Sequence, residues 1–155
     1  AAIQPLEFWC EDGTRCGENN FHIAFDWERR VATVDSADAR REFALPESAL
    51  DRGSLQVALM RELAATGAAG KLGLADEDGI VEYEYTDGGT ETMPTGTGPV
   101  ATRVLTQQRA GSSRVTSLWM APELRFLPVR IEQRRDGEVQ TAFELLNVSG
   151  LTPSR

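Results

Sequence analysis

The residues that could do chemistry in this chain are few, and its single histidine, His22, comes first. A histidine-dependent hydrolase would use His22 as its general base, and Asp26 lies on the same face of the strand predicted around it. Four residues along a strand span about 13 Å, which is too far for a hydrogen bond between these two side chains. No serine stands in the Gly-flanked elbow that marks a nucleophile. The sequence therefore favours a non-catalytic protein, assigns no catalytic residue and makes a hydrolase the least favoured alternative.

The two cysteines, Cys10 and Cys16, bracket a short segment that contains Asp12-Gly13. If the flanking segments form a hairpin, the two cysteines face each other across its base, which suits a disulfide. Two free thiols or a shared metal ion are the alternatives. A disulfide would indicate an oxidising compartment, so the pair favours a periplasmic or secreted protein.

Two short motifs resemble ligand-binding loops, and both fail on spacing. Gly67-Ala68-Ala69-Gly70-Lys71 lacks the first glycine of a phosphate loop and the Ser or Thr after its lysine, and it follows a predicted helix instead of a strand. Asp76-Glu77-Asp78-Gly79 lacks the spaced ligands and the closing Glu of an EF-hand, so we interpret it as a solvated turn. The sequence therefore predicts no cofactor and no metal site.

The composition is typical of a globular domain, with 41% hydrophobic and 26% charged residues in a chain of 155. A net charge of −8 makes nucleic acid an unfavourable partner. No apolar run is long enough to form a transmembrane segment. We expect a single β-rich domain over residues 1–150 and a frayed tail over residues 151–155.

Alternation of apolar and polar residues predicts most of the strands. The clearest case is residues 21–27, where apolar Phe21, Ile23, Phe25 and Trp27 are separated by His22, Ala24 and Asp26. Weaker alternation predicts further strands over 6–10, 31–34, 81–85, 100–108 and 114–119. The segment 67–78 is expected to be mostly loop, and Asp87-Gly88-Gly89 is expected to be a turn.

One helix is predicted, from about Ser54 to Thr66. Leu55, Leu59 and Leu63 recur at helical spacing and give it a narrow apolar stripe. Asp51 or Ser54 can cap its start, and Gly67 suits a left-handed stop.

The stretch from Trp119 to Ile131 predicts the end of one strand, a turn at Pro122 and the start of the next strand. Asp136-Gly137 marks the hairpin that follows. We prefer a three-residue loop, Arg135-Asp136-Gly137, because it puts one apolar set on a buried face. Its predicted pairs are Leu127 with Leu145, Val129 with Phe143, Ile131 with Thr141 and, on the other face, Arg134 with Glu138.

The expected fold is mainly β: an antiparallel meander curled into a barrel or half-barrel, with one α-helix packed on it. A helix is about 10 Å wide and strands lie about 4.8 Å apart, so this helix would shield only two to three strands. The remaining apolar face would close on itself, meet another segment or bind a ligand. The candidate lining residues of such a site are Phe25, Trp27, Tyr83, Trp119, Val129 and Phe143.

Several stretches, taken in order, resemble the bacterial domain-of-unknown-function 3108 family over about residues 5–148. They are Phe25-Asp26-Trp27, residues 51–60, Pro94-Thr95-Gly96-Thr97 with Thr102-Arg103-Val104, and above all residues 118–131. Arg125 departs from the family pattern, in which a Gly is common. The resemblance implies an exported periplasmic or envelope protein that lacks its first strands in this sequence, and it implies no activity.

These observations leave two main interpretations of function. The first is a non-catalytic envelope protein that holds a hydrophobic small molecule or lipid on the concave face of a half-barrel. The second is a structural or protein-interaction module whose exposed sheet edge recruits a partner strand.

Overall fold

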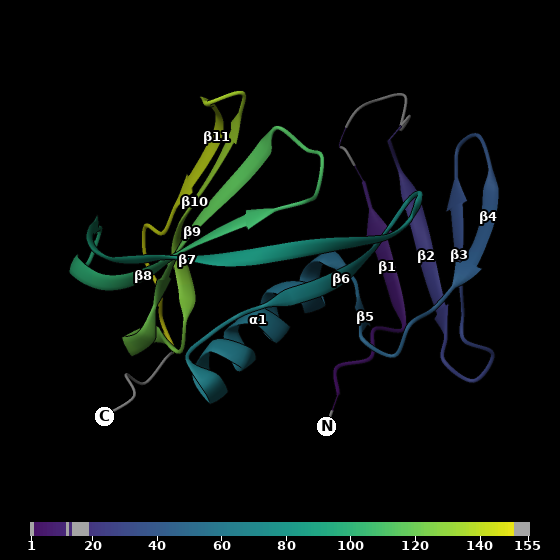
Figure 1. The fold of residues 1–155 in the computed structure, drawn as a ribbon, viewed down its shortest axis with the longest axis horizontal. Helices are drawn as coiled ribbons and strands as arrows, with labels where there is room; N and C mark the ends of the chain where they lie inside the picture. The colour runs from purple at the N-terminus through teal and green to yellow at the C-terminus, as the bar shows by residue number, and fades with distance from the viewer. Residues whose placement is uncertain (1, 12, 14–18, 151–155) are drawn as a thin grey trace. The chain divides into compact units, whose positions relative to one another are not determined.

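The structure is a computed structural model, and it describes residues 2–11, 13 and 19–150. Cys16 and the tail 151–155 lie outside the described residues, so the predictions of a disulfide and of a frayed tail stay predictions. Eleven strands, one α-helix and one short 3-10 helix are found in the described part of the chain (Figure 1).

The chain divides into two compact units. Unit 1 consists of Ala1–Val57 and Leu72–Glu82, and unit 2 consists of Ala58–Lys71 and Tyr83–Arg155.

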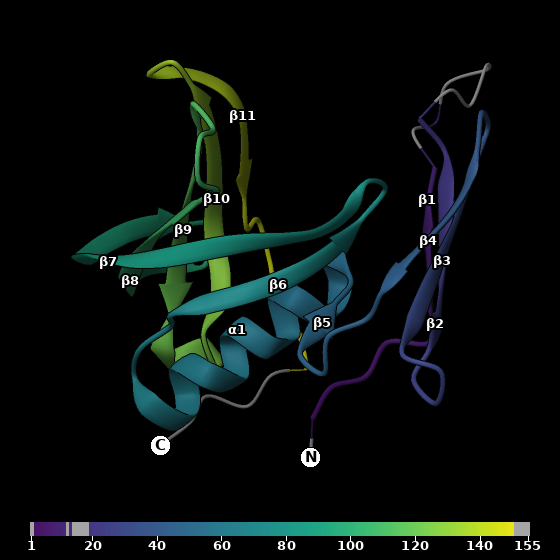
Figure 2. The same ribbon diagram turned by 45° about the vertical axis from the view of Figure 1, so that its right-hand side comes forward.

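Unit 1 is built around a four-stranded antiparallel sheet in the order β1-β2-β3-β4, whose strands run side by side in Figures 1 and 2. The strands are β1 (Glu7–Cys10), β2 (Phe21–Asp26), β3 (Val31–Ser36) and β4 (Arg40–Ala44). Phe21, Ile23 and Phe25 are buried while the residues between them are half-buried, which confirms the alternation predicted for this segment. Phe8, Cys10, Trp27 and Phe43 pack against this core.

The helix α1 (Arg52–Thr66) follows the two-residue strand β5 (Ala49–Leu50). Its start is a reciprocal cap, because Ser54 N donates to Asp51 Oδ1 at 2.7 Å and Asp51 N donates to Ser54 Oγ at 2.9 Å. Gly67 ends it with a φ of 71°. The predicted helix is therefore confirmed, and it begins two residues earlier than expected.

The segment after the helix was predicted to be loop, and that prediction is wrong. Lys71–Asp76 forms β6, which pairs in parallel with β5, so the sheet is not wholly antiparallel. A helix that connects two neighbouring strands returns the chain in the same direction, which is why this one pair is parallel.

The second sheet has the order β11-β10-β9-β8-β7-β6-β5. Unit 2 contributes its antiparallel part, which is a meander with β10 and β11 at the top of Figures 1 and 2. The bounds are β7 (Gly79–Thr95), β8 (Gly98–Gln108), β9 (Arg114–Ala121), η1 (Pro122–Leu124), β10 (Leu127–Arg135) and β11 (Glu138–Glu144).

A mainly β fold with one helix is confirmed. Neither sheet of the described strands closes into a barrel, so the closed barrel, one of the two predicted forms, is wrong.

Asp87-Gly88-Gly89 was predicted to be a turn, but β7 continues through it to Thr95. Asp87 still pairs with Leu105, and Gly88 and Gly89 form a bulge before the pairing resumes at Thr90. A bulge and a turn both use backbone angles that residues other than glycine avoid. Two adjacent glycines are therefore compatible with either one.

The predicted register of the last hairpin is also wrong. Asp136 and Gly137 both have positive φ, which makes a two-residue turn closed by Arg135 and Glu138. A bulge then inserts Gln140 between the Val139 and Thr141 pairings, so Ile131 faces Phe143. Phe143, predicted to be buried, is 66% exposed.

The antiparallel part of unit 2 curls strongly. Val100, Ala121 and Val129 form a small core, and Met93 of β7 and Leu145, directly after β11, pack against it. The backbone of Gly96, between β7 and β8, lies against the carbonyl oxygen of Leu146, beyond β11. The end of one hairpin therefore touches the segment that follows the edge strand.

Candidate functional site

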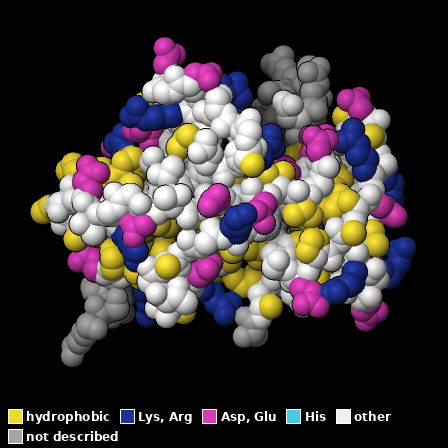
Figure 3. All heavy atoms as spheres, in the orientation of Figure 1, with side chains coloured by type: hydrophobic (Ala, Val, Ile, Leu, Met, Phe, Trp, Pro, Cys, Tyr) yellow, Lys and Arg dark blue, Asp and Glu magenta, His cyan; other side chains and the backbone are white. Residues whose placement is uncertain are grey.

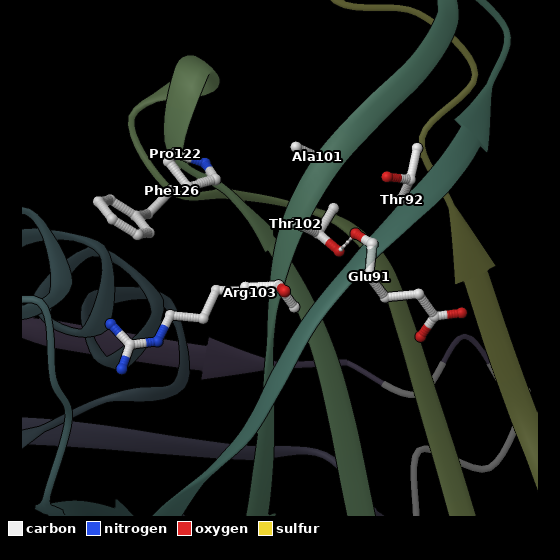
Figure 4. Close-up of a pocket in the computed structure, with 8 residues that line it drawn as sticks. Glu91, Thr92, Ala101, Thr102, Arg103, Pro122 and Phe126 are labelled. Atoms are coloured by element: carbon white, nitrogen blue, oxygen red, sulfur yellow. Dashed lines mark hydrogen bonds between the residues drawn. The ribbon is translucent and has the colours of Figure 1, made fainter.

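One hollow of about 340 Å³ lies in unit 2 where β7 and β8 meet the turn after β9 (Figure 4). It is lined by Thr90, Glu91, Thr92, Ala101, Thr102, Arg103, Pro122 and Phe126. The hydroxyl of Thr102 donates a hydrogen bond to the carbonyl oxygen of Glu91 at 2.6 Å, and Figure 4 draws this bond as a dashed line.

Arg103, the one cation of this hollow, is already engaged by the protein. It donates to the carboxylate of Asp87 and to the carbonyl oxygen of Gly67, at the stop of α1. Arg103 and the amide N–H of Gly89 hold the pKa of the Asp87 carboxyl below its usual value. A guanidinium at the negative end of a helix is stabilising, so we assign Arg103 a structural role.

The turn beside the hollow is more strained than the sequence predicted. Pro122–Leu124 forms the 3-10 helix η1, and Arg125 and Phe126 then follow with φ near 56° and 60°. Phe126 N donates to Ala121 O at 2.8 Å, which closes the turn. The left-handed φ at Arg125 explains why glycine would suit this position.

A network of charged and aromatic side chains crosses the sheet of unit 2. Trp119 Nε1 donates to Glu91 Oε2 at 2.8 Å, and the Arg130 guanidinium lies 5.4 Å from the centre of the Trp119 ring. Arg130 also pairs with Glu132 at 2.7 Å and with Glu144. The network ends at Glu144 on β11, whose side chain is 61% exposed.

The buried member of this network is Glu132, which is only 6% exposed. Hydrogen bonds from Arg130 and Arg134 hold the pKa of its carboxyl below the usual value. Both partners sit two residues away on the same strand, so they share its face of the sheet. With both of its oxygens engaged, this carboxylate is satisfied, and we assign it a structural role.

The outer edge of unit 2 differs from these satisfied sites. All seven residues of β11 are exposed, and β11 is the terminal strand in the order of described strands. Cross-strand pairing aligns four apolar residues in one row, one each on β8, β9, β10 and β11. In that order they are Leu105, Leu118, Ile131 and Phe143. The first two are buried, Ile131 is half-buried and Phe143 is open to solvent. The row thus runs from the interior to an uncovered end.

The backbone of this edge has donors and acceptors that face outward. Leu145 N donates to Val129 O at 2.8 Å, which identifies these two residues as a hydrogen-bonded pair. Antiparallel ladders alternate hydrogen-bonded and non-hydrogen-bonded pairs, so the N–H and C=O of Ala142 and Glu144 point away from β10.

His22 lies in unit 1 on a row that crosses all four strands, in the order Trp9, His22, Asp35 and Arg40. Its ring stacks on Trp9 with 3.8 Å between the ring centres, and its Nε2 is 3.8 Å from a Glu7 oxygen. A second hollow, in unit 1, is lined by His22 together with Cys10 and Ser36. Both Cys10 and Ser36 pair with Phe21, so strand alternation turns their side chains to the face opposite His22. Of the described residues, Cys10 and Ser36 are therefore not on the face of the sheet that carries His22.

The six predicted lining residues divide between the units: Phe25 and Trp27 belong to unit 1, and Tyr83, Trp119, Val129 and Phe143 belong to unit 2. Phe25 and Trp27 stack in the core of unit 1, with 6.2 Å between ring centres. Val129 and Trp119 pack in the small core of unit 2, in which Tyr83 and Phe143 have no part. Each pair therefore fills an interior of its own unit.

Charged side chains of both signs are interspersed over the face seen in Figure 3. No group of three or more His, Cys, Asp and Glu residues in the described part of the chain could hold a metal ion. No described helix is long and apolar enough to cross a bilayer.

Comparison with known proteins adds the family. The model of the family described as "Protein of unknown function (DUF3108)" matches residues 15–143. The chain belongs to this family. No curated protein and no solved structure matches the chain significantly. This membership confirms the resemblance seen in the sequence and supplies no activity.

The sequence missed the edge site because it placed Phe143 on a buried face. The run Asp136-Gly137 was a usable signal for a two-residue turn, since both residues favour positive φ. Nothing in the local sequence marked the bulge at Gln140 that restores the apolar pairing beyond that turn.

Proposed function

We propose that this DUF3108 protein is a protein-interaction module that accepts an extended strand of a partner along the edge of β11. The observation that carries the proposal is the uncovered end of the apolar row at Phe143, beside outward backbone groups at Ala142 and Glu144. Strand addition needs both features, because main-chain hydrogen bonds give affinity and side-chain contacts give specificity.

The exposure of apolar residues supports this location. Seven large hydrophobic side chains are exposed among the described residues, and three of them, Val139, Phe143 and Leu146, lie within this short segment. An exposed apolar group beside an open edge would normally be avoided, since it invites aggregation. Its presence here favours a partner that covers it.

The alternative of an apolar ligand in a half-barrel has weaker support. Its predicted lining residues fill separate cores, and the hollow at Arg103 has its cation engaged with Asp87 and Gly67. We further propose that the protein acts in the periplasm or outside the cell, which the spacing of Cys10 and Cys16 supports.

A substitution of Ala142 by proline tests the proposed function. Proline would remove the outward N–H and leave the hydrogen bonds between β10 and β11 in place, because Ala142 faces Glu132 in a non-hydrogen-bonded pair. A library of short linear peptides rich in β-branched residues would be selected on the wild-type protein and counter-selected on Ala142→Pro.

We expect peptides that bind the wild type and not Ala142→Pro, with equal thermal unfolding of the two proteins as the control. A library that yields only peptides indifferent to Ala142→Pro would refute strand addition at this edge.

A further inference from the structure

The pattern of side chains on β11 specifies the chemistry of the strand that would lie beside it. Because of the bulge at Gln140, Phe143, Thr141 and Glu138 project from one face of the sheet, and Glu144, Ala142 and Val139 from the other. Next to Phe143, a partner strand therefore meets an apolar surface on the first face and a carboxylate on the second.

The carboxylate of Glu144 ends a row that contains an aromatic ring, a cation and an anion. On the second face, Trp119 is followed by Arg130 and then by Glu144. Arg130 is itself held between Glu132 and Glu144, so it is neutralised within the sheet. Glu144 remains 61% exposed on the terminal strand of the sheet, and a cation on an added strand would be its opposite-charge cross-strand neighbour.

The other end of β11 carries a second carboxylate, on the face of Phe143. Glu138 pairs with Arg135 of β10 and is exposed at the edge.

We infer that the partner strand is amphipathic and cationic, with apolar residues on the face of Phe143 and Lys or Arg residues on the face of Glu144. This inference rests on the proposed function, since it assumes that a strand adds to β11. It names the partner's chemistry: an extended segment in which basic and apolar residues alternate.

Three labelled peptides of equal length test it by fluorescence anisotropy. The first alternates Arg with Val, the second Gln with Val and the third Glu with Val. We expect the Arg peptide to bind about threefold to tenfold more tightly than the Gln peptide, because cross-strand ion pairs contribute modestly each, and the Glu peptide to bind most weakly. Added salt should reduce the difference.

Variants assign the effect to the edge. Glu144→Gln should weaken the Arg peptide about threefold and leave the Gln peptide unchanged. Glu123→Gln, an exposed position on η1 and not on β11, is the matched control and should change neither. Ala142→Pro should abolish binding of both peptides.

The outcomes separate the two proposals. If Gln or Glu peptides bind as tightly as the Arg peptide and Ala142→Pro still blocks them, the cationic partner is wrong and strand addition stands. If Arg peptide binding survives Ala142→Pro, it is a general attraction to an acidic chain, and both proposals fail.

Discussion

At the scale of single residues, the tightest constraint in unit 2 is a glycine. A Cβ atom at Gly96 would overlap the carbonyl oxygen of Leu146, and a backbone atom cannot turn aside as a side chain can. Gly96 is therefore required by a close approach of two chain segments.

We predict that Gly96→Ala lowers the free energy of unfolding by about 2 kcal/mol, because the hairpin end must move away from Leu146. Gly70→Ala is the matched control, since a Cβ there meets nothing within 4 Å and should change stability by less than about 0.5 kcal/mol. Chemical denaturation of both variants measures the difference. Equal values would mean that the two segments do not touch in solution.

A second residue-scale prediction concerns Glu132. Arg130 and then Arg134 lower the pKa of its carboxyl in the folded protein, so the unfolded chain takes up the proton first as the pH falls. The stabilisation is fully present above the unfolded pKa, near 4.5, and is lost as the pH falls through the lower folded value. Glu132→Gln should cost about 2 kcal/mol at neutral pH.

The pH dependence distinguishes this effect from lost packing. In urea denaturation over a series of pH values, the difference between wild type and Glu132→Gln should shrink below about pH 4.5. Glu123→Gln, on the exposed turn η1, serves as the control. A difference that stays constant down to acid pH would contradict the role assigned to the carboxylate.

At the scale of elements, the hairpin of β10 and β11 shows how an edge changes the value of a residue. Leu118 and Phe143 belong to the same apolar row, yet Leu118 is 5% exposed and Phe143 is 66% exposed. Burial, and not residue type, sets how much an apolar side chain stabilises the fold.

We predict that Leu118→Ala destabilises the protein by about 3 kcal/mol, whereas Phe143→Ala costs less than about 1 kcal/mol. The aromatic ring loses little contact on truncation because most of it already faces solvent. Thermal or chemical unfolding of the two variants tests this. A large loss for Phe143→Ala would show that the ring is covered in solution.

At the scale of the whole molecule, the open question is the compartment in which the chain works. The spacing of Cys10 and Cys16 predicts a disulfide, and Cys16 lies outside the described residues. The family match shows the family to which the chain belongs, and the periplasmic or extracellular compartment stays a proposal.

We predict that Cys10 and Cys16 are oxidised in protein that has been exported to a periplasm, and that the disulfide stabilises it by about 2 kcal/mol. Thiol titration of the denatured, unreduced protein measures the oxidation, and Cys10→Ser with Cys16→Ser measures the stability. Two free thiols in exported material would contradict the prediction. Protein made in a reducing cytoplasm is not a suitable sample.

The sequence by itself determined the local elements whose signals lie within a few residues. The alternation of Phe21, Ile23 and Phe25 marked a strand, and the Leu55, Leu59 and Leu63 stripe with Gly67 marked a helix and its end. It also carried the family, through the run from Leu118 to Ile131. These features depend on backbone preference and side-chain period, which the chain has before it folds.

Only the tertiary structure decided which of these faces is covered. Alternation divides a strand into two faces, but burial depends on the neighbours, so Phe143 could not be recognised as exposed until β11 was found at the edge. The bulge at Gln140 shifted the register by one residue, which moves every later side chain of β11 to the opposite face. The same pairing left Phe143 and Glu144 exposed on the terminal strand.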